Sequence, residues 1–341
     1  MAEISKFMQV SIENLAKLFG VSKSSLNDVV GLTVPAGGAG GDRGVFGGGW
    51  DGDSYDSNTI DYITISSIGN AQDFGDLVLG RGYPGSTSNG GNNRGVFGSG
   101  FNGSNNNIMD YITISTAGNA QDFGDLTAIK HGVGGTSNNT NNRGVFAGGF
   151  NGSVYINTIE YVTISSIGDA ADFGDLTIAK GYLAATSNGI NNRGVFGASV
   201  KNSGLTNIID YITINSIGNA TDFGDATTSL NAKASTSNLT NNRGVFAGGF
   251  NLAGSSFDII EYITISTPGN AADFGDLTQS RSWFGAVSNG TNERGVFGGG
   301  SFDGVSFFNI LDYITINSTS DAIDFGDLTL TRDGVLSTSN A

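Results

Sequence analysis

The tetrapeptide Arg-Gly-Val-Phe recurs along this chain, and its spacing constrains the fold more than any other feature. The arginines of its six copies are Arg43, Arg94, Arg143, Arg193, Arg243 and Arg294. The period is therefore about 50 residues, and it runs from residue 43 almost to the last residue. Such a period is typical of repeat architectures, in which each repeat is one supersecondary unit that packs on its neighbours.

Two further blocks recur in every period. The first is a run such as IDYITIS (60–66), and the second is DFGDL (73–77), which departs only where Ala226 replaces Leu. Together with segments such as GYLAATS (181–187), these pieces are short, rich in β-branched and aromatic residues, and bounded by Asn, Gly and Ser, which is typical of strands. Each period thus predicts four short strands, and four-stranded antiparallel sheets repeated around an axis form a β-propeller.

The phase of the repeat predicts how the ring closes. Six Ser-Asn pairs end the innermost strands, at Asn89, Asn138, Asn188, Asn238, Asn289 and Asn340. The first RGVF strand has no inner strand before it, and the last Ser-Asn pair has no RGVF strand after it. If RDGVLSTSN (332–340) supplies the inner strand of the first blade, every blade has four strands. We therefore expect an all-β, six-bladed β-propeller over residues 43–341, closed by its C-terminal strand.

The order of these blocks resembles the kelch repeat. GYLAATSN, RGVFAGG, IEYVTIS and DFGDL follow one another as the kelch strands do. The basic residue that often precedes the kelch inner strand is matched by Arg81, Lys130, Lys180, Arg281 and Arg332. Two departures are the Phe of DFGDL, where kelch repeats usually carry Trp, and the segment with Asn231 and Lys233 around the basic position. The resemblance implies a kelch-like propeller.

The wording of the repeat is also similar to that of certain viral proteins. DYITIS, GNA and DFGDL, in this order, look like repeats in structural proteins of tailed phages, especially marine and cyanobacterial ones. This resemblance implies a structural role in a phage particle.

Composition excludes several classes of function. The 55 glycines suggest low complexity, but 38% hydrophobic and 10% aromatic residues suffice for a core. The formal net charge of −15 disfavours nucleic acid and anionic membranes as partners. With no Cys and one His, we expect neither a disulfide framework nor a His or Cys metal site. We also expect no cofactor, no secretion signal and no membrane insertion.

The propeller model separates constant loops from variable loops. Successive antiparallel strands alternate in direction, so the loops after the first and third strands of each blade share one face, here called the constant face. The loops after the second and fourth strands share the other, the variable face, and those after the second differ in every repeat, from GGGWDGDSYDSN (47–58) to GGGSFDGVSFFN (298–309). Binding residues are concentrated on variable loops held by a rigid scaffold.

Aromatic and acidic residues of the variable loops are the candidate ligand-binding residues. They suit sugar stacking or a protein interface, although such aromatics can also simply plug the blade ends. The candidates are Trp50, Asp51, Asp53, Tyr55, Tyr155, Phe257 and Trp283, with Tyr83 and Tyr182 near the loops after the fourth strands. Calcium binding by Asp51 and Asp53 stays open, beside the commoner role of Asp in turns.

The recurrence of RGVF has a structural explanation in this fold. Its Gly allows close packing near the axis, and its Val and Phe fill the layers on either side of the blade. Its Arg has two interpretations: a structural ion pair or carbonyl cap, or a functional ring of arginines on the constant face.

The N-terminal segment is of a different kind. In residues 1–35, Ser11 is a plausible helix start and Gly20 a plausible stop. The apolar positions of this expected helix are Ile12, Leu15, Leu18 and Phe19. Some of its wording resembles a DNA-binding helix-turn-helix, but the segment carries few basic residues. We expect a helical docking segment joined to the propeller by a Gly-rich tether that ends at about residue 42.

These features favour a non-catalytic virion module. The chain is expected to attach to a phage capsid, neck or tail through residues 1–35 and to display its variable loops toward a surface glycan or protein. It would then be located in the virion, assembled in the host cytoplasm. The alternatives are an intracellular kelch-like protein-interaction scaffold and, third, a glycan-active enzyme.

Overall fold

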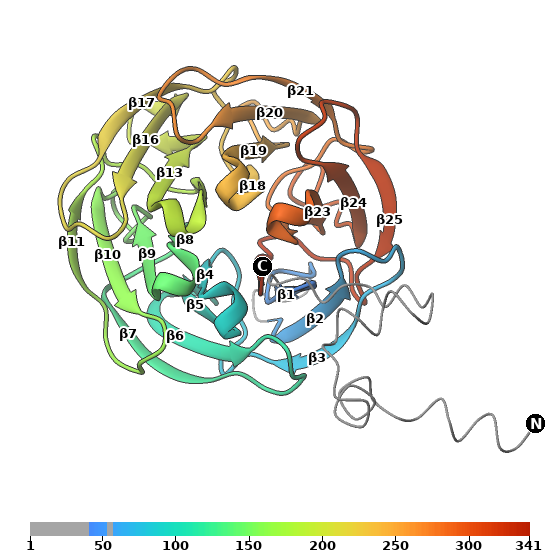
Figure 1. The fold of residues 1–341 in the computed structure, drawn as a ribbon, viewed down its shortest axis with the longest axis horizontal. Coiled ribbons are helices and arrows are strands. Elements are labelled where there is room, and N and C mark those ends of the chain that lie inside the picture. Colours follow the sequence, from blue (N-terminus) through green and yellow to red (C-terminus); the bar gives the residue numbers. More distant parts are fainter. Residues whose placement is uncertain (1–40, 53–56) are drawn as a thin grey trace, which may run out of the picture. The chain divides into compact units, whose positions relative to one another are not determined.

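The propeller expected from the repeat is confirmed. A computed structural model describes residues 41–52 and 57–341, which form six four-stranded blades around a central axis (Figure 1). Within these residues the regular structure is all β apart from single-turn 3-10 helices. The helical docking segment expected over residues 1–35, with Ile12, Leu15, Leu18 and Phe19, lies outside the described residues, as does its tether up to residue 40.

Each blade is an antiparallel sheet that runs from the axis to the rim. The first blade contains β26 (Leu336–Ser339), β1 (Arg43–Gly47), β2 (Thr59–Thr64) and β3 (Gln72–Asp76). The second contains β4 (Gly85–Ser88), β5 (Arg94–Phe101), β6 (Asn105–Thr113) and β7 (Gln121–Lys130). The third contains β8 (Gly134–Ser137), β9 (Arg143–Ala147), β10 (Thr158–Thr163) and β11 (Ala171–Asp175).

The remaining blades follow the same order. The fourth contains β12 (Ala184–Ser187), β13 (Arg193–Gly197), β16 (Ile208–Thr213) and β17 (Thr221–Asp225), with a small hairpin of β14 (Ser199–Lys201) and β15 (Gly204–Thr206). The fifth contains β18 (Ala234–Ser237), β19 (Arg243–Ala247), β20 (Ile259–Thr264) and β21 (Ala272–Asp276). The sixth contains β22 (Gly285–Ser288), β23 (Arg294–Gly298), β24 (Ile310–Thr315) and β25 (Ile323–Asp327).

The C-terminal strand closes the ring as the phase of the repeat predicted. β26 is antiparallel to β1, with Phe46 opposite Ser337. The backbone N–H of Gly41 donates to the Asn340 carbonyl at 2.6 Å. All six second strands are therefore paired on both sides.

The packing between blades explains the recurrence of Gly-Val-Phe. Val45 packs with Phe97 between the first and second blades, whereas Phe46 packs with Val296 between the sixth and first. The glycine lies at a close approach: a Cβ on Gly144 would stand 2.7 Å from Cγ2 of Thr87 in the preceding blade. The predicted roles of these three residues are confirmed.

The RGVF arginines cap carbonyl groups of neighbouring blades. The Arg143 guanidinium lies 4.7 Å from the centroid of the Tyr161 ring in its own blade and donates to the Ile214 carbonyl of the next blade at 3.1 Å. The same pair of contacts is made by Arg43, Arg94, Arg193, Arg243 and Arg294. The carbonyl-capping interpretation is thus confirmed, and each arginine joins two blades.

Asparagines link the blades on the constant face. An Asn follows the inner strand of every blade, and in five of the six blades a single 3-10 turn comes next: η1 (Gly90–Asn92), η2 (Asn139–Asn141), η3 (Gly189–Asn191), η4 (Leu239–Asn241) and η5 (Gly290–Asn292). The Asn89 amide donates to Oδ1 of Asn142 in the next blade at 2.9 Å, and Asn340 makes the same bond to Asn93 across the closure. These side-chain hydrogen bonds therefore join neighbouring blades on the constant face, including those next to the closure.

Candidate functional site

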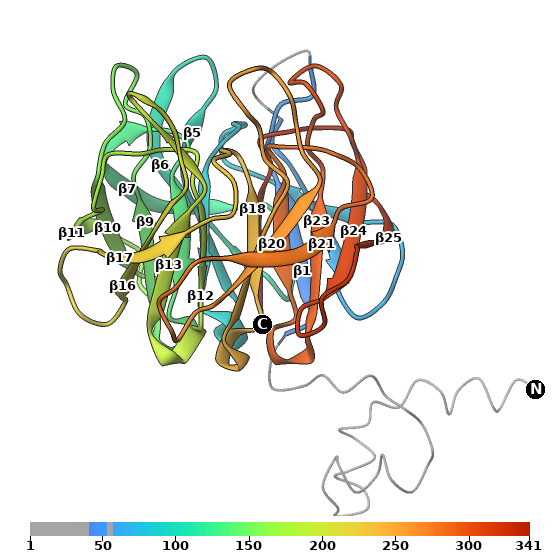
Figure 2. The same cartoon turned by 90° about the horizontal axis from the view of Figure 1, so that it is seen from above.

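The two faces of the propeller differ as expected. Figure 2 shows the 3-10 turns and the C-terminal end of the chain on one face and the loops after the second strands on the opposite face. The face with the 3-10 turns is the constant face. The other is therefore the place to look for residues that distinguish this propeller.

Each blade contains a buried ion pair between its inner-strand entrance and its third strand. The pairs are Arg81–Asp110 at 2.9 Å, Lys130–Glu160 at 3.0 Å, Lys180–Asp210 at 3.1 Å, Arg281–Asp312 at 2.8 Å, Arg332–Asp61 at 2.8 Å, and Lys233–Glu261. Burial lowers the pKa of Lys180, an effect that the neighbouring Asp210 carboxylate opposes. In the fifth blade Leu230 occupies the position of the other bases, and Lys233 lies three residues later. Its long side chain nevertheless reaches Glu261, the third-strand acid of that blade. The departure seen around Asn231 is therefore compensated in the structure.

A threonine of the preceding blade completes the hydrogen bonding of these carboxylates. Thr278 donates to Asp312 and Thr329 to Asp61, each at 2.6 Å. For Asp110 of the second blade, the corresponding residue of the preceding blade is Val78, and Oδ1 of Asp110 is buried with no hydrogen-bond partner among the described residues. Such an unsatisfied buried acceptor is destabilising.

Replacing Val78 by Thr should therefore stabilise the protein. The new hydroxyl would donate to Oδ1 of Asp110, and we expect a gain of about 1 kcal/mol in the free energy of unfolding, measured by urea denaturation. Ile129→Thr, at another exposed position, is the control and should give no gain. Equal effects of the two substitutions would contradict this account of Asp110.

A closed ring of backbone hydrogen bonds surrounds the axis near the variable face. Its members, here called the axial ring, are Tyr83, Gly132, Tyr182, Ala232, Trp283 and Gly334. Each N–H donates to the carbonyl of the member in the preceding blade, at 2.6 to 3.2 Å. All six have left-handed backbone conformations, with φ between 52° and 66°. The ring thus holds one residue of every blade at the axis.

Large and small side chains alternate around this ring. Tyr83, Tyr182 and Trp283, here called the axial cluster, come from every second blade. Their ring centroids lie 4.8 Å apart for Tyr182 and Trp283, 5.0 Å for Tyr83 and Trp283, and 6.1 Å for the two tyrosines. The three rings meet edge to face across the axis and are half-buried. They close the central channel at the variable face.

Two buried titratable groups contact the tyrosines of this cluster. His131 Nε2 lies 2.6 Å from the Tyr182 hydroxyl, and Nδ1 lies 2.6 Å from Oδ1 of Asn105. Burial lowers the pKa of His131 to about 4. Burial raises the pKa of Asp333 to about 7, although hydrogen bonds from the Ser301 and Tyr83 side chains lower it. At neutral pH His131 is therefore neutral, and Asp333 titrates.

These two groups should give opposite pH dependences of stability. Between about pH 4 and 7 folded Asp333 holds a proton that the unfolded chain releases, so its contribution to stability falls as pH rises. Between about pH 4 and 6.5 the unfolded chain holds a proton that folded His131 lacks, so its contribution rises. Relative to the wild type, His131→Asn should lose stability with rising pH and Asp333→Asn should gain it, by up to about 1.4 kcal/mol per pH unit. Urea denaturation at several pH values checks this, and slopes of the same sign would contradict it.

The structure brings some of the candidate binding residues together. Trp283 belongs to the axial cluster, and Tyr155 packs on Tyr182 with centroids 6.3 Å apart. Trp50 packs edge-on against Phe307, with centroids 5.1 Å apart, and its backbone N–H donates to the Asp333 carbonyl at 2.8 Å.

Two further candidates lie in loops of the first and fifth blades. Phe257 is half-buried in a fifth-blade loop, and Asp51 is exposed. Asp53 and Tyr55 lie outside the described residues. In residues 41–52 and 57–341 no group of three or more His, Asp or Glu is placed to hold a metal ion. Asp303, in the corresponding sixth-blade loop, accepts the N–H groups of Val305 and Ser306, as an Asp in a turn does.

Tyr83 and Tyr182 were expected near the loops after the fourth strands, whereas His131 was not among the candidate residues. The signal for the axial cluster was one position in successive repeats, occupied in turn by Tyr, Gly, Tyr, Ala, Trp and Gly. The alternation indicates a cluster of three aromatic rings only when the fold brings the six positions together at the axis.

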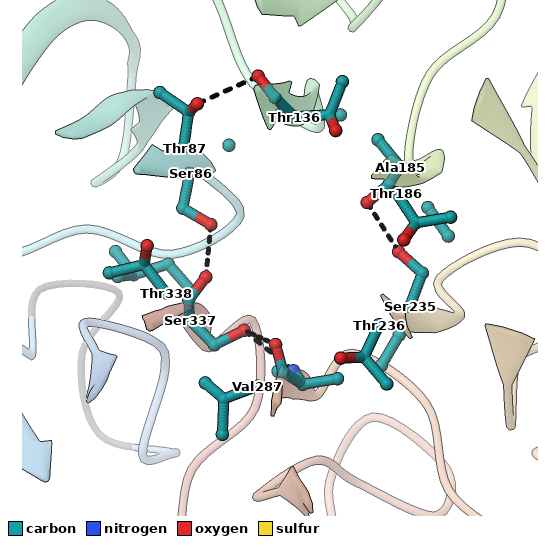
Figure 3. A pocket seen from close by; sticks show the side chains of 18 of the residues that line it. Ser86, Thr87, Thr136, Ala185, Thr186, Ser235, Thr236, Val287, Ser337 and Thr338 are labelled. Carbon is teal, nitrogen blue, oxygen red and sulfur yellow. Dashed lines mark hydrogen bonds between the residues drawn. The ribbon is translucent and has the colours of Figure 1, made fainter. Parts of the chain in front are cut away.

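The central channel below the axial cluster is lined by hydroxyl groups. Its volume is about 210 Å³, and Figure 3 shows Ser and Thr side chains of the inner strands around it. The Ser235 hydroxyl donates to the Ala185 carbonyl at 2.9 Å, and that of Thr87 to the Thr136 carbonyl at 2.9 Å. These hydroxyl groups link neighbouring inner strands, so the channel lining stabilises the ring of blades.

Comparisons with known proteins give no assignment. No family model matches the chain, and no curated protein sequence matches it. Among the described residues, no helix has the length and apolar character needed to span a membrane. The proposal for function therefore rests on the fold and on the variable face.

Proposed function

We propose that the chain is a non-catalytic virion module that is attached through residues 1–35 and displays its variable face for binding. The observation that supports the proposal is that the described chain begins on the face opposite the variable loops. The described chain begins at Gly41, which is bonded to Asn340 at the constant face, whereas the variable loops lie on the opposite face (Figure 2). A segment preceding Gly41 therefore joins the propeller at its constant face.

The construction of the ring supports this role. Arginine caps, asparagine links and buried ion pairs repeat in every blade, and they hold a frame on which the loops vary. Rigid scaffolds with variable loops are a common solution for recognition. The six buried bases are each engaged with an acid of their own blade, which accords with a structural role and a non-catalytic protein.

The sequence of the repeat is the basis for proposing a phage particle. DYITIS, GNA and DFGDL look like phage structural repeats, and we propose a tailed-phage capsid, neck or tail as the site of attachment. The partners would be other virion proteins at residues 1–35 and a cell-surface glycan or protein at the variable face.

Removal of residues 1–35 tests the attachment. We expect the truncated protein to melt cooperatively like the full chain, because the described blades close without these residues. It should be missing from purified particles assembled in its presence, as judged by immunoblotting. Full-length protein carrying Trp50→Ala is the control and should be incorporated normally. Incorporation of the truncated protein would overturn the proposed anchor.

A further inference from the structure

The axial cluster combines aromatic side chains with a backbone conformation that disfavours them. Tyr83, Tyr182 and Trp283 have φ values of 58°, 52° and 63°, in the left-handed region that L side chains rarely adopt. The three intervening blades form the same hydrogen-bonded ring with Gly132, Ala232 and Gly334. The ring therefore closes without aromatic residues, and their presence has to be explained by what the side chains do. Strained residues of this kind are concentrated at ligand sites.

Packing alone accounts for only part of these side chains. All three residues are half-buried, so part of each remains accessible to solvent. Further aromatic rings surround them: Phe150 packs on His131 with centroids 5.7 Å apart, and Phe250 on Trp283 at 6.5 Å. These contacts gather several aromatic rings around the axis.

Polar groups lie next to these rings. Oδ1 of Asn231, one residue before Ala232 of the axial ring, is buried and has no hydrogen-bond partner among the described residues. Oδ1 of Asp333, one residue before Gly334, is in the same situation. These buried oxygens make the layer beneath the rings polar, whereas the partly exposed rings themselves match a ligand with apolar C–H faces, as a sugar has.

The placement of cations excludes an acidic ligand. Six of the 16 Lys and Arg residues are the RGVF arginines, and six more form the buried ion pairs. Lys201, in the β14 and β15 hairpin, is the remaining base of residues 41–52 and 57–341. With a net charge of −15, a face so poor in cations repels sulfated, phosphorylated and sialylated glycans.

We propose that the axial cluster is a stacking platform for a neutral oligosaccharide. The rings of Tyr83, Tyr182 and Trp283 would contact the C–H faces of its pyranose units. This inference rests on the proposed function, in which the variable face is the binding face. It shifts the main contact from the Trp50 loop to the axis.

Because the chain has few Trp residues, binding at the axial cluster can be followed by Trp fluorescence. The chain has two Trp residues, so in the Trp50→Phe variant all Trp emission comes from Trp283. We would titrate this variant with chitohexaose, cellohexaose and maltohexaose. A saturable change in emission with at least one of these sugars is expected, and no change with heparin or polysialic acid. Failure of all three neutral sugars at millimolar concentration, or binding of the polyanions alone, would overturn the proposal.

Trp283→Gly supplies the decisive variant. Glycine occupies the equivalent position in Gly132 and Gly334, so the axial ring should still close and the melting transition should stay cooperative. Calorimetry should show about tenfold weaker binding of the sugar, because a stacking ring is lost. Tyr83→Gly should act in the same direction, and Ile68→Ala, at an exposed position of the constant face, is the control that keeps affinity. Unchanged affinity in both glycine variants would overturn the proposal, as would a pull-down in which the axial cluster binds a host protein and no sugar.

The two proposals fail separately. If the protein is found in particles but binds no neutral sugar, the stacking platform is refuted and the proposed virion role still stands. A protein that binds sugar at the axis but is absent from particles refutes the virion assignment and leaves the platform.

Discussion

Deleting residues 333–341 is expected to abolish cooperative folding of the propeller. The deletion removes β26, so β1 loses its partner on the axial side and exposes a row of unpaired backbone groups. It also removes Val335 and Leu336 from the hydrophobic layers on the two sides of the first blade. Gly334, a member of the axial ring, is lost as well. Thermal unfolding followed by circular dichroism should show no sharp transition, and light scattering should show aggregation.

A circularly rearranged chain is the control, because it restores the missing inner strand while residues 333–341 stay absent from the C-terminus. In this control residues 333–341 are fused to the N-terminal side of residues 40–332. The connection then runs from Asn340 through four residues to Arg43, the same spacing as from Asn89 to Arg94. The rearranged protein should recover a cooperative transition. A deletion variant that melts like the wild type would contradict the observed closure.

The substitution Asp210→Asn should destabilise the protein by about 3–5 kcal/mol. It leaves the buried Lys180 ammonium without its counter-ion, a situation far costlier than the loss of a surface pair. Lys180 retains only its bonds to the Phe196 and Ile208 carbonyls, at 3.3 and 3.0 Å. The Thr177 hydroxyl also loses its carboxylate acceptor, to which it donates at 2.5 Å. Urea denaturation gives the change in the free energy of unfolding.

The double substitution Lys180→Met and Asp210→Leu is the matched control. It replaces the pair by apolar side chains, and most of the lost stability should return. If the single and double variants are equally destabilised, the cost comes from packing, and the assignment of a buried charge pair is wrong.

The repeat made the architecture predictable because it acts through local pattern and phase. Short strands bounded by Gly and Asn, an inner strand missing before Arg43 and an extra one ending at Asn340 determine six blades and their closure. The segregation of loops into two faces follows from strand direction alone.

The site was harder to predict because it depends on contacts between repeats. Tyr83 and Trp283 are 200 residues apart in the sequence, and nothing local indicates that their rings meet at 5.0 Å. The burial of His131 likewise depends on Tyr182, which belongs to the next blade. Lys233 shows the same limit, since only the folded blade reveals that it reaches Glu261 from a shifted position.

A cryo-electron microscopy reconstruction of the purified parent particle tests the central claim most directly. The claim is that the propeller is held on the side of its constant face and presents its axial cluster outward. The account predicts that Gly41 and the 3-10 turns face the particle, with Tyr83, Tyr182 and Trp283 directed to solvent. A reconstruction in which the variable loops are buried against the particle and the 3-10 turns face solvent would contradict it.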